Sequence, residues 1–125
     1  SMTFDLPNKL KNKKIIAWGA SKLLEFYRQN LNTYDIAYAV DSNTELQGKR
    51  VSGIEVKSPQ ELRNEDMSEI VVVIFVVSNV SIQEILKVMN SFGGLLHHNV
   101  FLYSDLFYES FCGKFENIFN RKIKI

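Results

Sequence analysis

The alternation of apolar and polar residues along the chain predicts strands that alternate with helices. Residues 14–18 (KIIAW) form a short apolar run that indicates a buried strand. The apolar residues that follow share the spacing of one helical face: Ala20, Leu23, Leu24, Tyr27 and Leu31. Residues 34–40 (YDIAYAV) then indicate a second buried strand, which ends at Asp41.

The longest apolar run, residues 70–77 (IVVVIFVV), predicts a central strand. The run is continuous and rich in β-branched residues, which is typical of a parallel strand covered by helices on both faces. Ser81 and Glu84 have the spacing of a capping box. A helix is therefore predicted to begin at Ser81 and to end at Gly93-Gly94.

Between the second strand and this central strand, the chain carries turn and cap signals. Residues 42–59 contain two glycines and short β-branched pieces, which predict a small hairpin or a long loop. Ser58, Pro59 and Glu61 predict a short helix over 59–66. Ser58 can cap this helix, Pro59 suits its first position, and Glu61 can complete a capping box.

The C-terminal part of the chain has a weaker pattern. Residues 98–103 (HNVFLY) predict a strand, a weaker helical segment follows at 104–111, and residues 113–125 have no clean period. We therefore divide the chain into three parts: an N-terminal extension with a tag scar (1–12), a Rossmann-like domain (13–112) and an unassigned C-terminal extension (113–125).

This order of elements predicts an α/β fold of the Rossmann-like, doubly wound type. We expect a mainly parallel sheet with helices on both faces and a hairpin or loop insertion after the second strand. Such sheets bind ligands at the carboxyl ends of their strands, where the strand order reverses. We expect this switch point between the strands that end at Trp18 and Val77. The candidate binding residues at this edge are Gly19, Ala20, Ser21, Lys22, Asp41, Asn43, Ser78 and Asn79.

The turn after the first strand suggests how a nucleotide could be held. Backbone N–H groups there can bind phosphate, and Asp41 can accept hydrogen bonds from a ribose diol. However, the fingerprint Gly-x-Gly-x-x-Gly has Gly19, Ser21 and Leu24 at its glycine positions. Ser21 adds a side chain where pyrophosphate normally approaches, unless its hydroxyl and Lys22 bind phosphate instead.

Composition narrows the class of protein. A chain of 125 residues with 46% apolar residues suits one domain, and a net charge of +1 without a basic face argues against a nucleic-acid partner. No apolar run approaches the roughly 20 residues of a membrane helix, and no leader is recognisable, so we expect a cytoplasmic protein. Cys112 is the single cysteine, which excludes internal disulfides and thiolate zinc sites.

Catalytic motifs are absent from the sequence. It has no Tyr-x-x-x-Lys pair, no Gly-x-Ser-x-Gly elbow, no Gly-Lys-Ser/Thr phosphate loop and no His-Glu-x-x-His. We therefore assign no catalytic or metal-binding residue. His97-His98 at a strand start favour packing over metal ligation, and Cys112 favours packing over nucleophilic catalysis.

Three features of the sequence each allow two interpretations. Trp18 could stack on a base, although a core position is favoured. Asp41 and Asn43 could bind a ligand or only form a turn. The aromatic residues near the C-terminus could belong to the core or form a docking surface: Phe101, Tyr103, Phe107, Tyr108, Phe111, Phe115 and Phe119.

Four stretches follow one another in an order that resembles a known domain: IIAWGAS, AVDSN, QGKRVSGIEVKSPQEL and EIVVVIFVVSNVSIQEILKVMNSFG. They resemble the Rossmann-like domain of bacterial surface-polysaccharide enzymes, where it is attached to sialic-acid-type sugar O-acyltransferases and sugar-modifying methyltransferases. The resemblance spans about residues 13–106. Its strongest parts are Asp41-Ser42-Asn43, Gly48 to Val56, and Pro59 to Leu62.

The resemblance implies a nucleotide- or nucleotide-sugar-binding module of bacterial cell-surface polysaccharide biosynthesis, without complete catalytic machinery of its own. Candidate ligands are NAD(P) and a nucleotide sugar. Candidate partners are an attached or separate catalytic domain and a second copy of the chain. The alternatives are a non-catalytic protein-interaction or scaffold domain, and the NAD-binding part of a sugar oxidoreductase.

Overall fold

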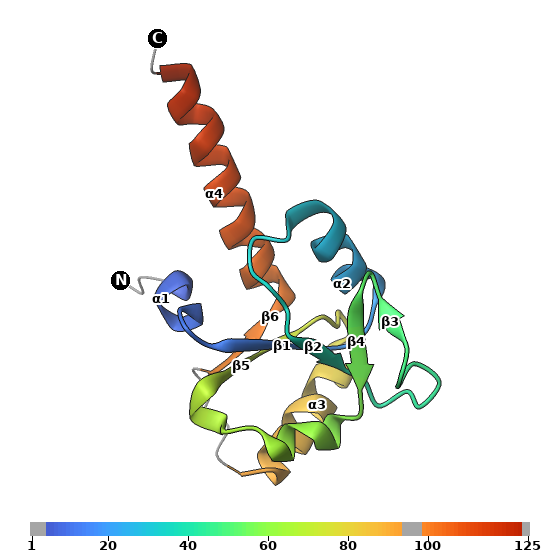
Figure 1. The fold of residues 1–125 in the computed structure, drawn as a ribbon. Helices are drawn as coiled ribbons and strands as arrows, with labels where there is room; N and C mark the ends of the chain where they lie inside the picture. The colour runs from blue at the N-terminus through green and yellow to red at the C-terminus, as the bar shows by residue number, and fades with distance from the viewer. Residues whose placement is uncertain (1–4, 94–98, 124–125) are drawn as a thin grey trace.

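A six-stranded sheet forms the centre of the molecule, which a computed structural model describes over residues 5–93 and 99–123 (Figure 1). Its strands are β1 (Lys14–Trp18), β2 (Tyr38–Val40), β3 (Arg50–Val51), β4 (Ile54–Lys57), β5 (Ile70–Ile74) and β6 (Val100–Leu102). They lie in the order β3-β4-β2-β1-β5-β6, and all neighbouring pairs are parallel except β3 with β4. The predicted α/β class with a mainly parallel sheet is confirmed.

The strand order places a switch point beside β1. From β1 the chain moves to one side to form β2 and β4, and it then returns to the other side to form β5 and β6. β1 and β5 pair over their full length, from Lys14 opposite Ile70 to Trp18 opposite Ile74. This arrangement is consistent with a Rossmann-like fold, in which the carboxyl ends of the two central strands border the ligand site.

Helices cover both faces of the sheet because alternate strand residues point in opposite directions. One core cluster joins Ile15, Ala17 and Val73 to α1 (Leu6–Leu10), α2 (Lys22–Phe26) and α4 (Tyr103–Ile123). The other cluster joins β-strand residues such as Ile16 and Val72 to α3 (Asn79–Ser91) and to the 3-10 helix η2 (Pro59–Asn64). Figure 1 shows α2 and α4 on one side of the sheet and α3 on the other.

The first predicted helix is correct in position but has two parts. α2 begins after Ser21 and continues into the π-helical turn η1 (Tyr27–Leu31). Ala20 precedes the helix, whereas Leu24, Tyr27 and Leu31 are buried as the helical spacing predicts. The chain then ends the turn at Asn32, which has a left-handed φ of 45°.

Two predicted strands are shorter in the structure. The second predicted strand includes only β2, because residues 34–37 lead into the sheet without forming a strand themselves. The central strand β5 ends at Ile74 and not at Val77, although Phe75 still donates its N–H to the Trp18 carbonyl at 2.8 Å. Val77 is 68% exposed. The apolar run is therefore longer than the strand, because its last residues form the connection to α3.

The predicted start of α3 at Ser81 is wrong by three residues. Ser78 is the N-cap, and its hydroxyl accepts a hydrogen bond from the Ser81 N–H at 3.3 Å. Ser81 and Glu84 therefore lie inside the helix, where no capping box is needed. α3 ends at Ser91, close to the predicted stop, and Gly93 has a positive φ of 69°. Gly94 lies outside the described residues.

The segment after β2 forms the predicted hairpin. β3 and β4 pair across a turn at Ser52-Gly53, both of which have positive φ, as a tight hairpin turn requires. β4 also pairs with β2, so the hairpin is part of the main sheet and not a separate insertion.

The short helix predicted over residues 59–66 is present, but it is a 3-10 helix and is shorter than predicted. η2 is a 3-10 helix that ends at Asn64. The Ser58 hydroxyl accepts the Gln60 N–H, and the Glu61 N–H donates to the Ser58 carbonyl at 3.0 Å. This i to i+3 pattern is the 3-10 geometry, and it replaces the predicted capping box.

Both ends of the chain are more helical than the sequence pattern predicted, although the helical segment expected at 104–111 is confirmed as part of α4. α1 lies in the N-terminal extension and buries Leu6 and Leu10 in the core. α4 is a single helix of 21 residues that crosses the expected boundary at 112 and extends away from the sheet (Figure 1). The strand predicted at 98–103 consists of β6 alone, since Tyr103 begins α4; His97 and His98 lie outside the described residues. In the described parts of the chain, no helix is long and apolar enough to cross a membrane.

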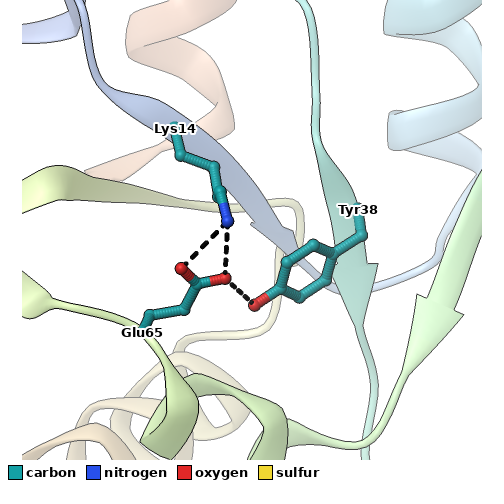
Figure 2. Close-up of polar contacts among 3 residues, drawn as sticks. All are labelled: Lys14, Tyr38 and Glu65. Carbon is teal, nitrogen blue, oxygen red and sulfur yellow. Dashed lines mark hydrogen bonds and ion pairs between the residues drawn. The ribbon is translucent and has the colours of Figure 1, made fainter.

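A polar cluster ties η2 to the amino ends of β1 and β2 (Figure 2). The Lys14 Nζ lies 3.0 and 3.1 Å from the Glu65 carboxylate oxygens, and the Tyr38 hydroxyl donates to Glu65 Oε2 at 2.8 Å. Burial alone would raise the pKa of Glu65, but the hydrogen bonds from Lys14 and Tyr38 outweigh it and lower that pKa. Burial and the neighbouring carboxylate raise the pKa of Tyr38.

Candidate functional site

A cavity of about 320 Å³ opens at the carboxyl ends of β1, β2 and β5. This is the edge at which the sequence places a ligand site. The cavity is lined by Trp18, Gly19, Asp41, Ser42, Val76, Val80, Ser81, Glu84 and Ile85. It therefore combines the turn after β1, the loop after β2 and the first turns of α3.

Gly19 is required by the backbone at this point. Its φ is +111°, a conformation that residues with a side chain rarely adopt. A Cβ atom on Gly19 would lie 2.9 Å from both the Phe75 carbonyl oxygen and Val76 Cγ2. The Gly19 N–H also donates to the Val40 carbonyl at 2.9 Å. The close packing of the turn against β5 therefore explains this glycine without a ligand.

The Asp41 carboxylate closes the turn from the neighbouring strand. Its Oδ2 accepts a hydrogen bond from the Ala20 N–H, and its Oδ1 accepts one from the Asn43 N–H, both at 2.9 Å. Asp41 therefore stabilises the turn, which is one of the two roles that the sequence allowed for it. An ionised carboxylate has about four acceptor positions, so Asp41 keeps capacity for a ligand hydroxyl in the cavity that it lines.

Ser21 is also engaged within the protein. Its hydroxyl donates to the Phe75 carbonyl at 2.8 Å and accepts a long hydrogen bond from the Leu24 N–H at 3.4 Å. Ser21 therefore caps α2 and joins it to β5. Leu24, at the third glycine position of the fingerprint, is fully buried in the core. Lys22 is exposed and does not line the cavity.

The loop after β2 is held by its own side chains. Asn43 accepts the Glu45 N–H on its Oδ1 at 3.0 Å, and Gln47 donates its side-chain amide to the Asp41 carbonyl at 2.8 Å. Asn43 is exposed and is not among the residues that line the cavity. Gln47 was not predicted as part of the site, because its contact depends on the path of the loop.

The structure gives Ser78 and Asn79 a different position from the one expected. Both are exposed at the start of α3, Ser78 as its cap, and neither lines the cavity. Because β5 ends early, the wall is formed by the next turn of α3, which includes Ser81 and Glu84. The sequence did single out these two residues, but only as a capping box.

Trp18 belongs mainly to the core. It is 4% exposed and packs with the apolar cluster between the sheet and α3, although it also forms part of the cavity wall. The charged residues of the wall are Asp41 and Glu84, and among the described residues no lysine or arginine lines the cavity. Glu84 lies 3.7 Å from Lys87, with both side chains largely exposed, so this pair neutralises it only weakly.

A second, larger cavity of about 620 Å³ lies between α3 and β6. Its wall is mainly apolar, with side chains such as Ile82, Leu86 and Leu102, and its charged members are Lys87 and Asp105. It lies away from the turn after β1, and none of the sequence-predicted binding residues lines it.

The aromatic residues near the C-terminus are partly packed in the core and partly exposed. Tyr103 and Phe107 contact each other, and Phe107 also packs against Tyr27 and Phe75; Phe101 is buried. Tyr108 and Phe111, in contrast, are 66% and 53% exposed on α4. Phe115 and Phe119 lie in the part of α4 whose side chains are not described.

Cys112 is half-buried. Among the described residues, no group of three histidine, cysteine, aspartate or glutamate side chains could hold a metal ion.

Comparison with known protein families gives a match over most of the chain. The model of a family described as "C2185-like, N-terminal" matches residues 11–93, which is more than half of the chain. The matched range extends from just before β1 to the end of α3 and contains the whole wall of the 320 Å³ cavity. No curated protein matches the chain significantly.

Proposed function

We propose that this chain, which belongs to the C2185-like N-terminal family, is a binding module for a nucleotide-type small molecule. The ligand occupies the cavity at the carboxyl ends of β1, β2 and β5. The observation that carries the proposal is the position of Asp41, a carboxylate that ends β2 at the switch point of a mainly parallel sheet and faces this cavity.

Each wall of the cavity suits part of such a ligand. Asp41 accepts hydrogen bonds from ribose or sugar hydroxyls with the acceptor positions that the turn does not use. Val76, Val80 and Ile85 provide apolar surface for a base. Glu84 and Ser81 add polar groups from α3.

The module acts without complete catalytic machinery of its own. This part of the proposal is supported by the absence of catalytic motifs in the sequence and by the family description, which names an N-terminal part. The resemblance to domains of surface-polysaccharide enzymes supports a role in bacterial sugar metabolism, with catalysis supplied by another domain or chain.

Binding is tested by thermal shift and calorimetry with the purified protein. The ligands are nucleosides, nucleoside diphosphates, nucleotide sugars, NAD(P), S-adenosylmethionine and coenzyme A. A ligand that binds the folded state at 100 times its Kd stabilises it by about 2.7 kcal/mol, which a thermal shift detects. If no compound in the panel shifts the melting temperature or releases heat at millimolar concentration, the proposed function is wrong.

A matched pair of variants locates the site. Ser81→Phe places a ring in the cavity wall from an exposed position, and Val88→Phe places the same ring on α3 outside both cavities. We expect Ser81→Phe to abolish binding and Val88→Phe to retain it. We do not choose Asp41→Ala for this test, because Asp41 also holds the turn.

A second candidate function is a protein-interaction domain. It is favoured by the exposed Tyr108 and Phe111 on α4, a helix that extends away from the sheet (Figure 1). Light scattering over a range of concentrations tests it with the variant Tyr108→Ser/Phe111→Ser. Self-association that this variant removes supports the candidate. A monomer at every concentration contradicts self-association through this surface.

A further inference from the structure

We infer that the cavity selects a ligand without a diphosphate, and that an uncharged or cationic nucleoside is the class it binds best. The inference rests on the proposed function, because it concerns the same cavity. It departs from the expectation of a dinucleotide or nucleotide sugar held by the turn after β1.

The first argument is that three donors of this turn already have acceptors within the protein. The Gly19 N–H donates to the Val40 carbonyl, and the Ala20 N–H donates to the Asp41 carboxylate, both at 2.9 Å. The Ser21 hydroxyl donates to the Phe75 carbonyl at 2.8 Å. A diphosphate would have to displace one of these protein acceptors before it gained a hydrogen bond from any of these three groups.

The second argument is that the Asp41 carboxylate already occupies the position where a phosphate would bind. Asp41 Oδ2 occupies the hydrogen-bonding position of the Ala20 N–H, so an incoming phosphate oxygen would meet a carboxylate there. Glu84 adds a second negative charge to the wall, and among the described lining residues no lysine or arginine offsets either of them. Like charges at this range disfavour a diphosphate and favour a neutral or positive ligand.

The third argument is size. A cavity of about 320 Å³ is at the small end of the range for ligand sites, about 300–1,000 Å³. One nucleoside is a better match to it than a dinucleotide. The wall has the two surfaces that a nucleoside requires: apolar side chains for the base, and the carboxylates of Asp41 and Glu84 for the sugar hydroxyls.

The test compares matched pairs of ligands by calorimetry on the full chain. The pairs are adenosine with ADP, guanosine with GDP, cytidine with CDP and uridine with UDP, and S-adenosylmethionine serves as a cationic nucleoside. In the pair that binds, we expect the nucleoside to bind at least tenfold more tightly than its diphosphate. A diphosphate that binds as tightly as its nucleoside, or more tightly, overturns the inference and leaves the proposed function standing. Absence of binding by every compound of this panel overturns the inference, and the proposed function fails with it if the wider panel given above also fails to bind.

A charge variant tests the electrostatic argument. Glu84→Gln removes one negative charge from an exposed position in the cavity wall, and Glu69→Gln removes the same charge from the exposed segment before β5, at the opposite edge of the sheet. We expect Glu84→Gln to raise the ratio of diphosphate affinity to nucleoside affinity about threefold, the size of one charge interaction at several ångströms in water. A contact of Glu84 with the sugar is common to both ligands, so its loss cancels in this ratio. An equal rise of the ratio in Glu69→Gln, or no rise in Glu84→Gln, contradicts the argument.

Discussion

Replacing Asp41 with alanine tests whether this carboxylate holds the turn after β1. The truncation removes the acceptors of two backbone N–H groups, those of Ala20 and Asn43. A hydrogen bond to a charged group contributes about 1.5–3 kcal/mol to stability. Asn43 is exposed, so water can replace its lost acceptor, whereas Ala20 is half-buried and its N–H is harder to rehydrate. We therefore expect Asp41→Ala to lower the free energy of unfolding by about 2–3 kcal/mol.

Urea denaturation measures this loss without a ligand. Trp18, the single tryptophan of the chain, is buried beside the turn and reports its unfolding by fluorescence. With an m-value of about 1–3 kcal/mol per molar urea, the midpoint should fall by roughly 0.7–3 M. Asp41→Asn keeps one acceptor oxygen and should lose about half as much.

The control for this experiment is Ser42→Ala. Ser42 follows Asp41 in the chain and is exposed, so its free energy of unfolding should stay within about 0.5 kcal/mol of the wild type. If Asp41→Ala is no less stable than this control, the carboxylate does not hold the turn. The argument that the phosphate position is already occupied would then fail as well.

Three further substitutions test the packing around the site and the cluster at the opposite edge. Gly19→Ala should lose about 2–4 kcal/mol in urea denaturation, because its φ of +111° is strained for alanine and its Cβ would meet the Phe75 carbonyl oxygen at 2.9 Å; a change below about 0.5 kcal/mol would refute this account. Leu24→Ala should lose about 2–5 kcal/mol in the same assay, since Leu24 is fully buried; near-wild-type stability would mean that the helix does not pack on the sheet as described. Glu65→Gln should lose about 1 kcal/mol at pH 7, a modest value because its partner Lys14 is half exposed. Since folding lowers the pKa of Glu65, this contribution is present above its unfolded pKa of about 4.3 and disappears as the pH falls through the folded pKa; a wild-type advantage unchanged at pH 3 would contradict that sign.

The elements that the sequence predicted correctly are those whose signal is local. The spacing of Leu24, Tyr27 and Leu31 follows one face of a helix, and all three are buried in the structure. The continuous β-branched run likewise predicted the central strand β5, because a strand covered on both faces needs apolar residues at every position.

The errors occur where two local signals compete or where the partner is far away in sequence. Ser78 and Ser81 are both suitable caps, and the choice depends on where β5 stops pairing with β1, at Ile74. The hairpin strand β4 joins the main sheet through β2, a contact that no local pattern specifies. α1 was missed because five residues give too short a pattern to recognise.

The candidate site shows the same division. The sequence by itself determined that a glycine turn, an acidic strand end and a helix start would meet at one edge of a parallel sheet. This was possible because the patterns that indicate strands and helices depend on residues close together in the sequence. Only the tertiary structure decided that Asp41 accepts the N–H of Ala20, 21 residues away, and that Ser21 donates to Phe75, 54 residues away. Hydrogen bonds over such separations depend on how the strands are packed. The pairing of these groups, and not their identity, gives the Ala20 N–H and the Ser21 hydroxyl their acceptors within the protein.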